Sequence, residues 1–167
     1  MLQNLITLGI ITLYALLVAY LLNAFINLQL RKFMKSNEVN LSLALVKLTF
    51  LVAGGLLLSE IPAVINTLSD TLRNQYAYVE LYKLTFQNVS FFIGIILLVL
   101  IFIYFVSTAL FRLVSPKNSF KIEVANNVVE RVIIFIGIVL IITFSIKGYI
   151  PILLDYFIPY QTIPTIR

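Results

Sequence analysis

The sequence predicts an all-α integral membrane protein, with four transmembrane helices arranged as two tandem helical-hairpin repeats in parallel orientation. Composition is the first reason: 61% of the 167 residues are hydrophobic and 11% are charged, whereas soluble domains carry roughly 45–50% and about 25%. The second reason is a pattern that recurs 85 residues further on, so that Gly9-Ile10-Ile11 corresponds to Gly94-Ile95-Ile96. Each copy holds two apolar segments joined by a short basic connection.

Four apolar segments are long enough to cross a membrane, at residues 5–26, 41–59, 89–113 and 128–146. A hydrocarbon core of about 30 Å takes roughly 20 helical residues. Because these segments and their connections use nearly the whole chain, we expect a single membrane domain over residues 1–167. Within it we expect a first hairpin repeat at 1–70, the rest of a connection at 71–88, and a second hairpin repeat with an interfacial tail at 89–167.

A signal peptide is the alternative interpretation of the first apolar segment. Such a peptide has a positive start, a short apolar core and a small-residue cleavage site. Only four residues precede the segment here, and the basic residues follow it. Its similarity to segment 89–113, which lies too far along the chain to be a signal, also favours a retained helix.

The positive charges predict the orientation, because eight of the twelve Lys and Arg residues lie in or beside the two short connections. The basic turns contain Arg31, Lys32, Lys35, Lys117 and Lys121. Basic residues beside membrane helices stay in the cytoplasm, so we expect both turns there and both termini outside. Each repeat has an even number of helices, so the two copies share one orientation. The distribution favours contact with membrane lipids over a nucleic-acid site.

The middle connection shows apolar residues every three to four positions from Ile61 to Phe86, which is typical of an amphipathic helix. Its tyrosines predict that this helix lies at the outer membrane interface. Two interpretations stay open, a lid or docking surface and a packed linker. After residue 148, Pro151, Pro159 and Pro164 exclude a long helix, so we expect a short interfacial piece.

Polar residues inside membrane segments need partners or a purpose. Glu60 and Lys147 should lie at similar depth, which predicts either an ion pair or part of an ion pathway. Asn23 and Thr108 should share a second level, where they either bridge helices or line a pore. We expect Glu130 to form a local, solvated pair with its neighbour Arg131.

Small residues predict where helices approach closely. We expect such contacts at Ala15, Ala19, Gly54, Gly55 and Gly137.

The chain contains no cysteine and no histidine, which removes thiolate chemistry, the commonest general base and the commonest transition-metal ligand. The sequence also shows no phosphate-binding glycine loop, no paired carboxylates and no potassium-type selectivity filter. We therefore expect no catalytic residues, no metal site and no cofactor.

Two stretches carry a family resemblance, residues 37–46 (NEVNLSLALV), which run into Ala53-Gly54-Gly55, and residues 123–129 (EVANNVV). They resemble the two helix starts of the YjfL-type family, small bacterial inner-membrane proteins with four helices in two copies and a domain of unknown function. Glu130-Arg131 depart from the smaller residues that the family has after the second asparagine. The resemblance implies the topology and a bacterial inner-membrane location, and it implies no catalytic residues.

Three functional hypotheses follow. The leading one is a non-enzymatic scaffold or anchor subunit that forms a homo-oligomer and binds a protein partner at the basic turns or the outer amphipathic helix. The alternative is a channel or transporter module that moves an ion or small solute past Glu60, Lys147, Asn23 and Thr108. The third is a membrane enzyme that modifies lipid.

Overall fold

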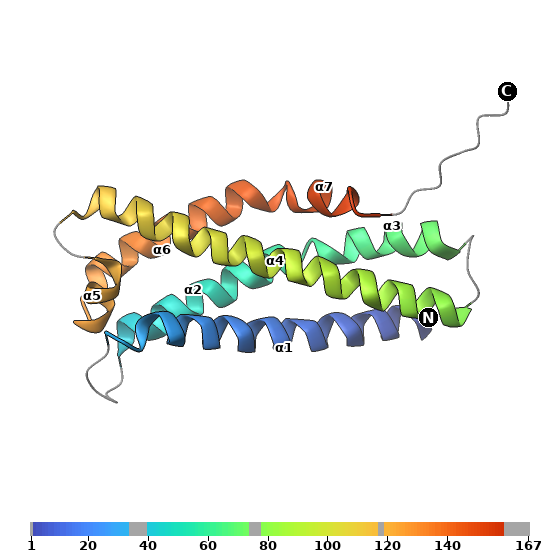
Figure 1. Cartoon of the computed structure of the whole chain (residues 1–167), viewed down its shortest axis with the longest axis horizontal. Helices are drawn as coiled ribbons and strands as arrows, with labels where there is room; N and C mark the ends of the chain where they lie inside the picture. Colours follow the sequence, from blue (N-terminus) through green and yellow to red (C-terminus); the bar gives the residue numbers. More distant parts are fainter. Residues whose placement is uncertain (1, 34–39, 74–77, 117–118, 159–167) are drawn as a thin grey trace, which may run out of the picture.

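The computed structural model describes residues 2–33, 40–73, 78–116 and 119–158, and every regular element within these ranges is an α-helix. The helices are α1 (Leu2–Leu30), α2 (Leu41–Leu58), α3 (Ile61–Arg73), α4 (Tyr78–Val114), α5 (Phe120–Ala125), α6 (Val129–Lys147) and α7 (Ile150–Asp155). They form one elongated bundle (Figure 1), in which α2 continues into α3 and α6 continues into α7. Helix α5 lies at one end, which we name the α5 end, and the opposite end contains α3 and α7.

Four segments are long and apolar enough to cross a membrane, as in a multi-pass membrane protein. They are Ile11–Leu30, Leu41–Leu72, Lys83–Val114 and Val129–Lys147. The predicted four spans therefore hold. Helices α2 and α6 begin and end within one residue of the predicted boundaries.

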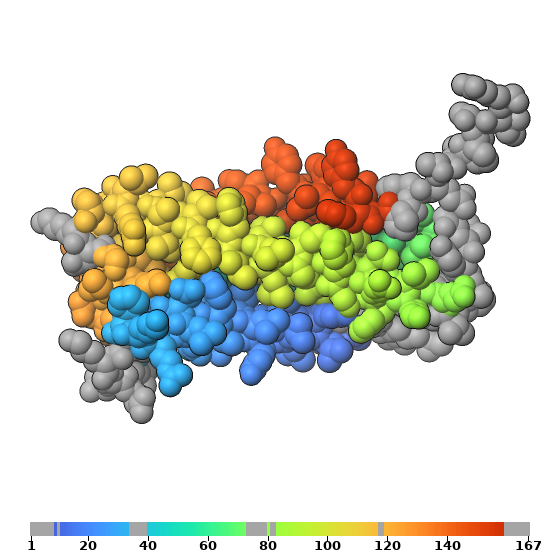
Figure 2. All heavy atoms as spheres, in the orientation of Figure 1, coloured from blue at the N-terminus to red at the C-terminus, as the bar shows by residue number. Residues whose placement is uncertain are grey.

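Helix α4 is much longer than the predicted third span, because it begins at Tyr78 rather than at residue 89. Its 37 residues extend about 55 Å at 1.5 Å per residue, well beyond a hydrocarbon core of about 30 Å. Figure 2 shows α4 beside α1 along one face of the bundle. The first turns of α4 carry Glu80 and Lys83 and pack against α3.

Helix α3 has a buried side and an exposed side. Ile61, Ile65, Leu68 and Leu72 are buried. Its exposed residues are Ala63, Asn66, Thr67 and Asp70. The predicted pattern was one helix running to Phe86, but α3 ends at Arg73 and Phe86 belongs to α4. Two helices that follow one another, each with a period near 3.6 residues, produce a sequence pattern that resembles one long helix.

A proline explains why α2 and α3 are separate helices. Pro62 has no N–H to donate to the carbonyl of Leu58, and its ring clashes with that carbonyl in a continuous helix. Helix α2 instead closes with a bond from the Ser59 N–H to the Gly55 carbonyl, and α3 begins two residues later. In the second hairpin, Gly148 caps α6 and Pro151 stands in the first turn of α7.

Aromatic rings fill the core of the bundle between α2, α4 and α6. Phe50, Tyr104, Phe111, Phe120 and Phe135 each have at most 1% of their surface exposed. The rings of Phe120 and Phe135 are stacked with their centroids 3.7 Å apart, and Phe135 also contacts Phe50 and Phe111. These rings are close-packed against one another at this level of the bundle.

Candidate functional site

A charged pair joins the two helix breaks. The Lys147 ammonium lies 3.2 Å from a carboxylate oxygen of Glu60, and the two side chains are 32% and 25% exposed. Glu60 stands in the two-residue break between α2 and α3, and Lys147 is the last residue of α6. The structure thus brings together the two residues that the sequence placed at similar depth.

The position of this pair has an electrostatic reason. The C-terminal carbonyls of α6 carry partial negative charge, which favours a cation at Lys147. Neutralising the lysine with a carboxylate lowers the cost of holding either charge near hydrocarbon. The pair therefore connects the two hairpins at the point where both helices are interrupted.

The other two residues of the proposed pathway, Asn23 and Thr108, belong to α1 and α4. Asn23 is exposed on α1. The Thr108 hydroxyl donates to the Tyr104 carbonyl of its own helix at 2.8 Å. Two hydroxyls near Thr108, those of Tyr104 and Ser107, are buried without a hydrogen-bond partner among the described residues. Among the described residues, neither Asn23 nor Thr108 forms a hydrogen bond with Glu60 or Lys147, and their part in a pathway stays a prediction.

Of the small residues predicted to lie at close helix contacts, Gly54 makes a tight contact and others face open space. A Cβ on Gly54 would lie 3.1 Å from Leu22 Cδ1, so this glycine lets α1 and α2 approach closely. Ala15 and Ala19 line a groove of about 150 Å³ beside it, together with Gly55. The close contacts predicted at Gly55 and Gly137 are wrong, because a Cβ there would meet no atom within 4 Å.

At the α5 end, hydrogen bonds join the two hairpins. They involve the residues at the start of α2. Asn40 caps α2 by accepting from the Leu43 N–H at 2.9 Å, and its amide donates to the Val124 carbonyl at 2.7 Å. Asn127 accepts from the Ser42 N–H at 2.9 Å. Two of the free N–H groups that begin every helix are thereby satisfied, one of them from the other hairpin.

Asn127 has a φ of 55°, in the left-handed region. Asparagine tolerates this conformation better than most residues. The turn between α5 and α6 therefore depends on this residue for its backbone as well as for its side chain. The capping bonds of Asn40 and Asn127 were not predicted from the sequence, although an Asn before an apolar run is a recognised helix-start signal.

A second ion pair lies at the same end, where Glu123 of α5 accepts from the guanidinium of Arg131 on α6. The Glu123 side chain is 2% exposed and that of Arg131 is 36% exposed. The predicted Glu130–Arg131 pair is wrong, since Arg131 bonds to Glu123 and Glu130 is exposed. Burial of Glu123 depends on α5 folding against α6, which sequence periodicity does not reveal.

The predicted basic turns are described in part. Arg31 and Lys32 are exposed after the end of α1. The Lys121 ammonium donates to the Gln29 side-chain oxygen at 2.9 Å and lies 5.5 Å from the centre of the Phe33 ring. Lys35 and Lys117 lie outside the described residues.

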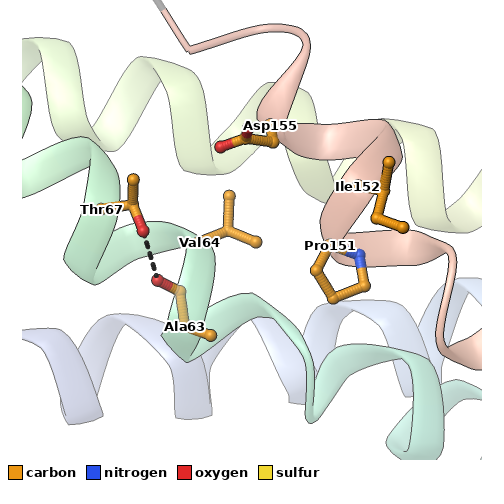
Figure 3. Close-up of a pocket in the computed structure, with 6 residues that line it drawn as sticks. All are labelled: Ala63, Val64, Thr67, Pro151, Ile152 and Asp155. Atoms are coloured by element: carbon orange, nitrogen blue, oxygen red, sulfur yellow. Dashed lines mark hydrogen bonds between the residues drawn. The ribbon is translucent and has the colours of Figure 1, made fainter.

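A shallow groove of about 270 Å³ lies between α3 and α7 at the opposite end (Figure 3). It is lined by Ala63, Val64, Thr67, Pro151, Ile152 and Asp155. The Thr67 hydroxyl donates to the Ala63 carbonyl at 3.3 Å, as Figure 3 shows, so it is used within its own helix. Across the part of the chain that the structure describes, no three Asp, Glu, His or Cys residues lie close enough to hold a metal ion.

Comparisons with known proteins do not add an identity. No protein-family model matches this chain, and neither a curated protein nor a solved structure matches it. The resemblance to the YjfL-type family therefore stays a prediction.

Proposed function

We propose that this protein is a non-enzymatic membrane subunit, which acts as an oligomeric scaffold or anchor for a protein partner. The observation that supports it most is how the charged residues are used. Both described ion pairs, Glu60–Lys147 and Glu123–Arg131, connect one helix to another. The level between them is filled by buried aromatic rings such as Phe50 and Phe135.

We further propose that the two hairpins are parallel repeats. Two contacts between α2 and the second hairpin support this, because they join residues that correspond in the repeat: Phe50 packs on Phe135, and the Ser42 N–H donates to Asn127. Corresponding helices also lie against each other, α2 against α6 and α3 against α7. Such contacts are expected near the axis that relates two copies of one orientation.

The proposed setting is the bacterial inner membrane, with the α5 end in the cytoplasm and both termini outside. Basic residues at the α5 end, such as Arg31 and Lys32, support this orientation. The exposed polar residues of α3 and the exposed Tyr149 and Tyr156 support an outer interfacial position for α3 and α7. The same topology is what the resemblance to the YjfL-type family implies.

The test of the scaffold proposal is purification in mild detergent, followed by native mass spectrometry and crosslinking in intact membranes. A scaffold subunit should be recovered as an oligomer or with a stoichiometric partner. Recovery as a monomer from both detergent and crosslinked membranes would contradict the proposal.

The second candidate function is a transporter module, and one observation favours it. Both hairpins contain an interrupted helix, and Glu60 and Lys147 join the interruptions. Helices interrupted at corresponding positions in two repeats often mark a transport site. Liposome flux assays separate the two functions: a flux that falls in both Glu60→Gln and Lys147→Gln supports transport, and a protein with no flux supports the scaffold.

A further inference from the structure

A groove of about 320 Å³ lies at the α5 end, where the turn that follows α1 meets α5 and the residue after it. It is lined by Lys32, Phe33, Ile122, Ala125 and Asn126. Figure 2 shows this region at one end of the bundle, where the light blue end of α1 lies beside the orange residues of α5. The groove is separate from both ion pairs and from the groove between α3 and α7.

The groove has a positive character. Lys32 is one of its lining residues, and the Lys121 ammonium contacts Gln29 and the ring of Phe33, which also lines the groove. None of the five lining residues is acidic. Glu123, on the same short helix as Lys121, does not line the groove; it is 2% exposed, and Arg131 compensates its charge.

Apolar surface adjoins these charges. Ile122 and Phe33 are 40% and 38% exposed in the lining, and Leu28, one helical turn before Lys32, is 69% exposed. The groove also lies where the first candidate span ends at Leu30. A ligand placed here would meet ammonium groups at the membrane surface and an apolar helix face beside them.

We propose that this groove binds an anionic phospholipid. Lys32 and Lys121 hold the headgroup phosphate, the Asn126 amide donates to the headgroup, and an acyl chain lies along α1 at Leu28. Basic pockets at the membrane surface are suited to such headgroups. A free phosphate ion uses the same charges but gains nothing from Leu28, Phe33 or Ile122, so the apolar border favours the lipid. The inference does not depend on the scaffold function.

The experiment measures lipid binding to the purified full chain by native mass spectrometry. Phosphatidylglycerol, phosphatidylcholine and inorganic phosphate are each added in turn. Wild-type protein should retain phosphatidylglycerol in preference to phosphatidylcholine. Since each lysine near a charged membrane surface contributes about 1 kcal/mol, Lys32→Gln/Lys121→Gln should weaken phosphatidylglycerol binding about 30-fold.

Two further variants separate a specific site from general charge and from misfolding. Lys83→Gln removes one exposed charge from the first turns of α4, far from the groove, and should leave binding unchanged. Lys32→Arg/Lys121→Arg keeps both charges and should retain most of the binding. The proposal is overturned if the double Gln variant binds phosphatidylglycerol like wild type, if Lys83→Gln weakens binding equally, or if inorganic phosphate binds as strongly as the lipid.

Discussion

The Glu60 carboxylate and the Lys147 ammonium lie 3.2 Å apart, although they belong to different hairpins and each stands where its helix is interrupted. We therefore expect stability to depend on having opposite charges at positions 60 and 147, and not on which position holds the acid. Lys147→Glu places two carboxylates together and should lower the free energy of unfolding by about 1–2 kcal/mol, between the values for surface and buried pairs. The exchanged variant Glu60→Lys/Lys147→Glu should recover most of that loss. Unfolding in mixed detergent, followed by circular dichroism, measures both; an exchanged variant no more stable than Lys147→Glu would contradict the pairing.

Asn127 is predicted to contribute through its backbone and its side chain. Asn127→Ala loses the bond to the Ser42 N–H and places an alanine at a φ of 55°, so the unfolding free energy should fall by about 2 kcal/mol. Asn127→Gly loses only the side-chain bond and should cost about 1 kcal/mol. Thermal unfolding in detergent gives the order wild type, then Gly, then Ala. Equal stability of the Gly and Ala variants would exclude the backbone contribution.

Glu123 should be far more sensitive to substitution than Glu130. Glu123→Gln removes the buried carboxylate that pairs with the Arg131 guanidinium and should lower the free energy of unfolding by about 2 kcal/mol. This is less than for a fully buried pair, because the Arg131 side chain is 36% exposed. Glu130→Gln changes the same charge on an exposed side chain and is the matched control. Chemical unfolding of the two variants under identical detergent conditions checks the difference, and equal effects would show that Arg131 does not select Glu123.

Gly54 should be the glycine that tolerates substitution least. Gly54→Leu drives a side chain into Leu22 and Leu100 and should destabilise the fold by about 1–3 kcal/mol through overpacking. Gly137→Leu is the control, because a Cβ at that position meets no atom within 4 Å. Parallel unfolding measurements on the two variants provide the test. A destabilised Gly137→Leu with an unaffected Gly54→Leu would contradict the packing of α1 on α2.

The chain has no cysteine, so single cysteines report the orientation directly. Thr67 is an exposed residue of α3, so the Thr67→Cys variant should react with a membrane-impermeant maleimide added to spheroplasts. Lys32→Cys should react only when the inner membrane is opened or inverted. The reverse result would place the α5 end outside and overturn the proposed topology.

Much of the fold could be predicted from the sequence, because every helix that crosses the hydrocarbon core must be apolar and about 20 residues long. The boundaries of α2 and α6 follow from where apolar runs end. Glu60 and Lys147 meet because α2 and α6 run in the same direction, so equal distance from their starts means equal depth. The first turns of α4 were predicted as part of the middle-connection helix rather than of the third span, since a helix that leaves the hydrocarbon no longer has to be apolar. Its extension depends on packing against α3.

The contacts of the residues at the α5 end could not be predicted without the folded structure. Glu123 looks in the sequence like one more charged residue of a basic turn, yet it is buried because Phe120 stacks on Phe135 and draws α5 against α6. Arg131 then bonds across eight positions to Glu123 rather than to its neighbour. Local pattern reveals which side of a helix is apolar, but the partner of a polar group depends on which segments fold together. That choice is made by contacts between residues distant in the chain, and only the tertiary structure contains them.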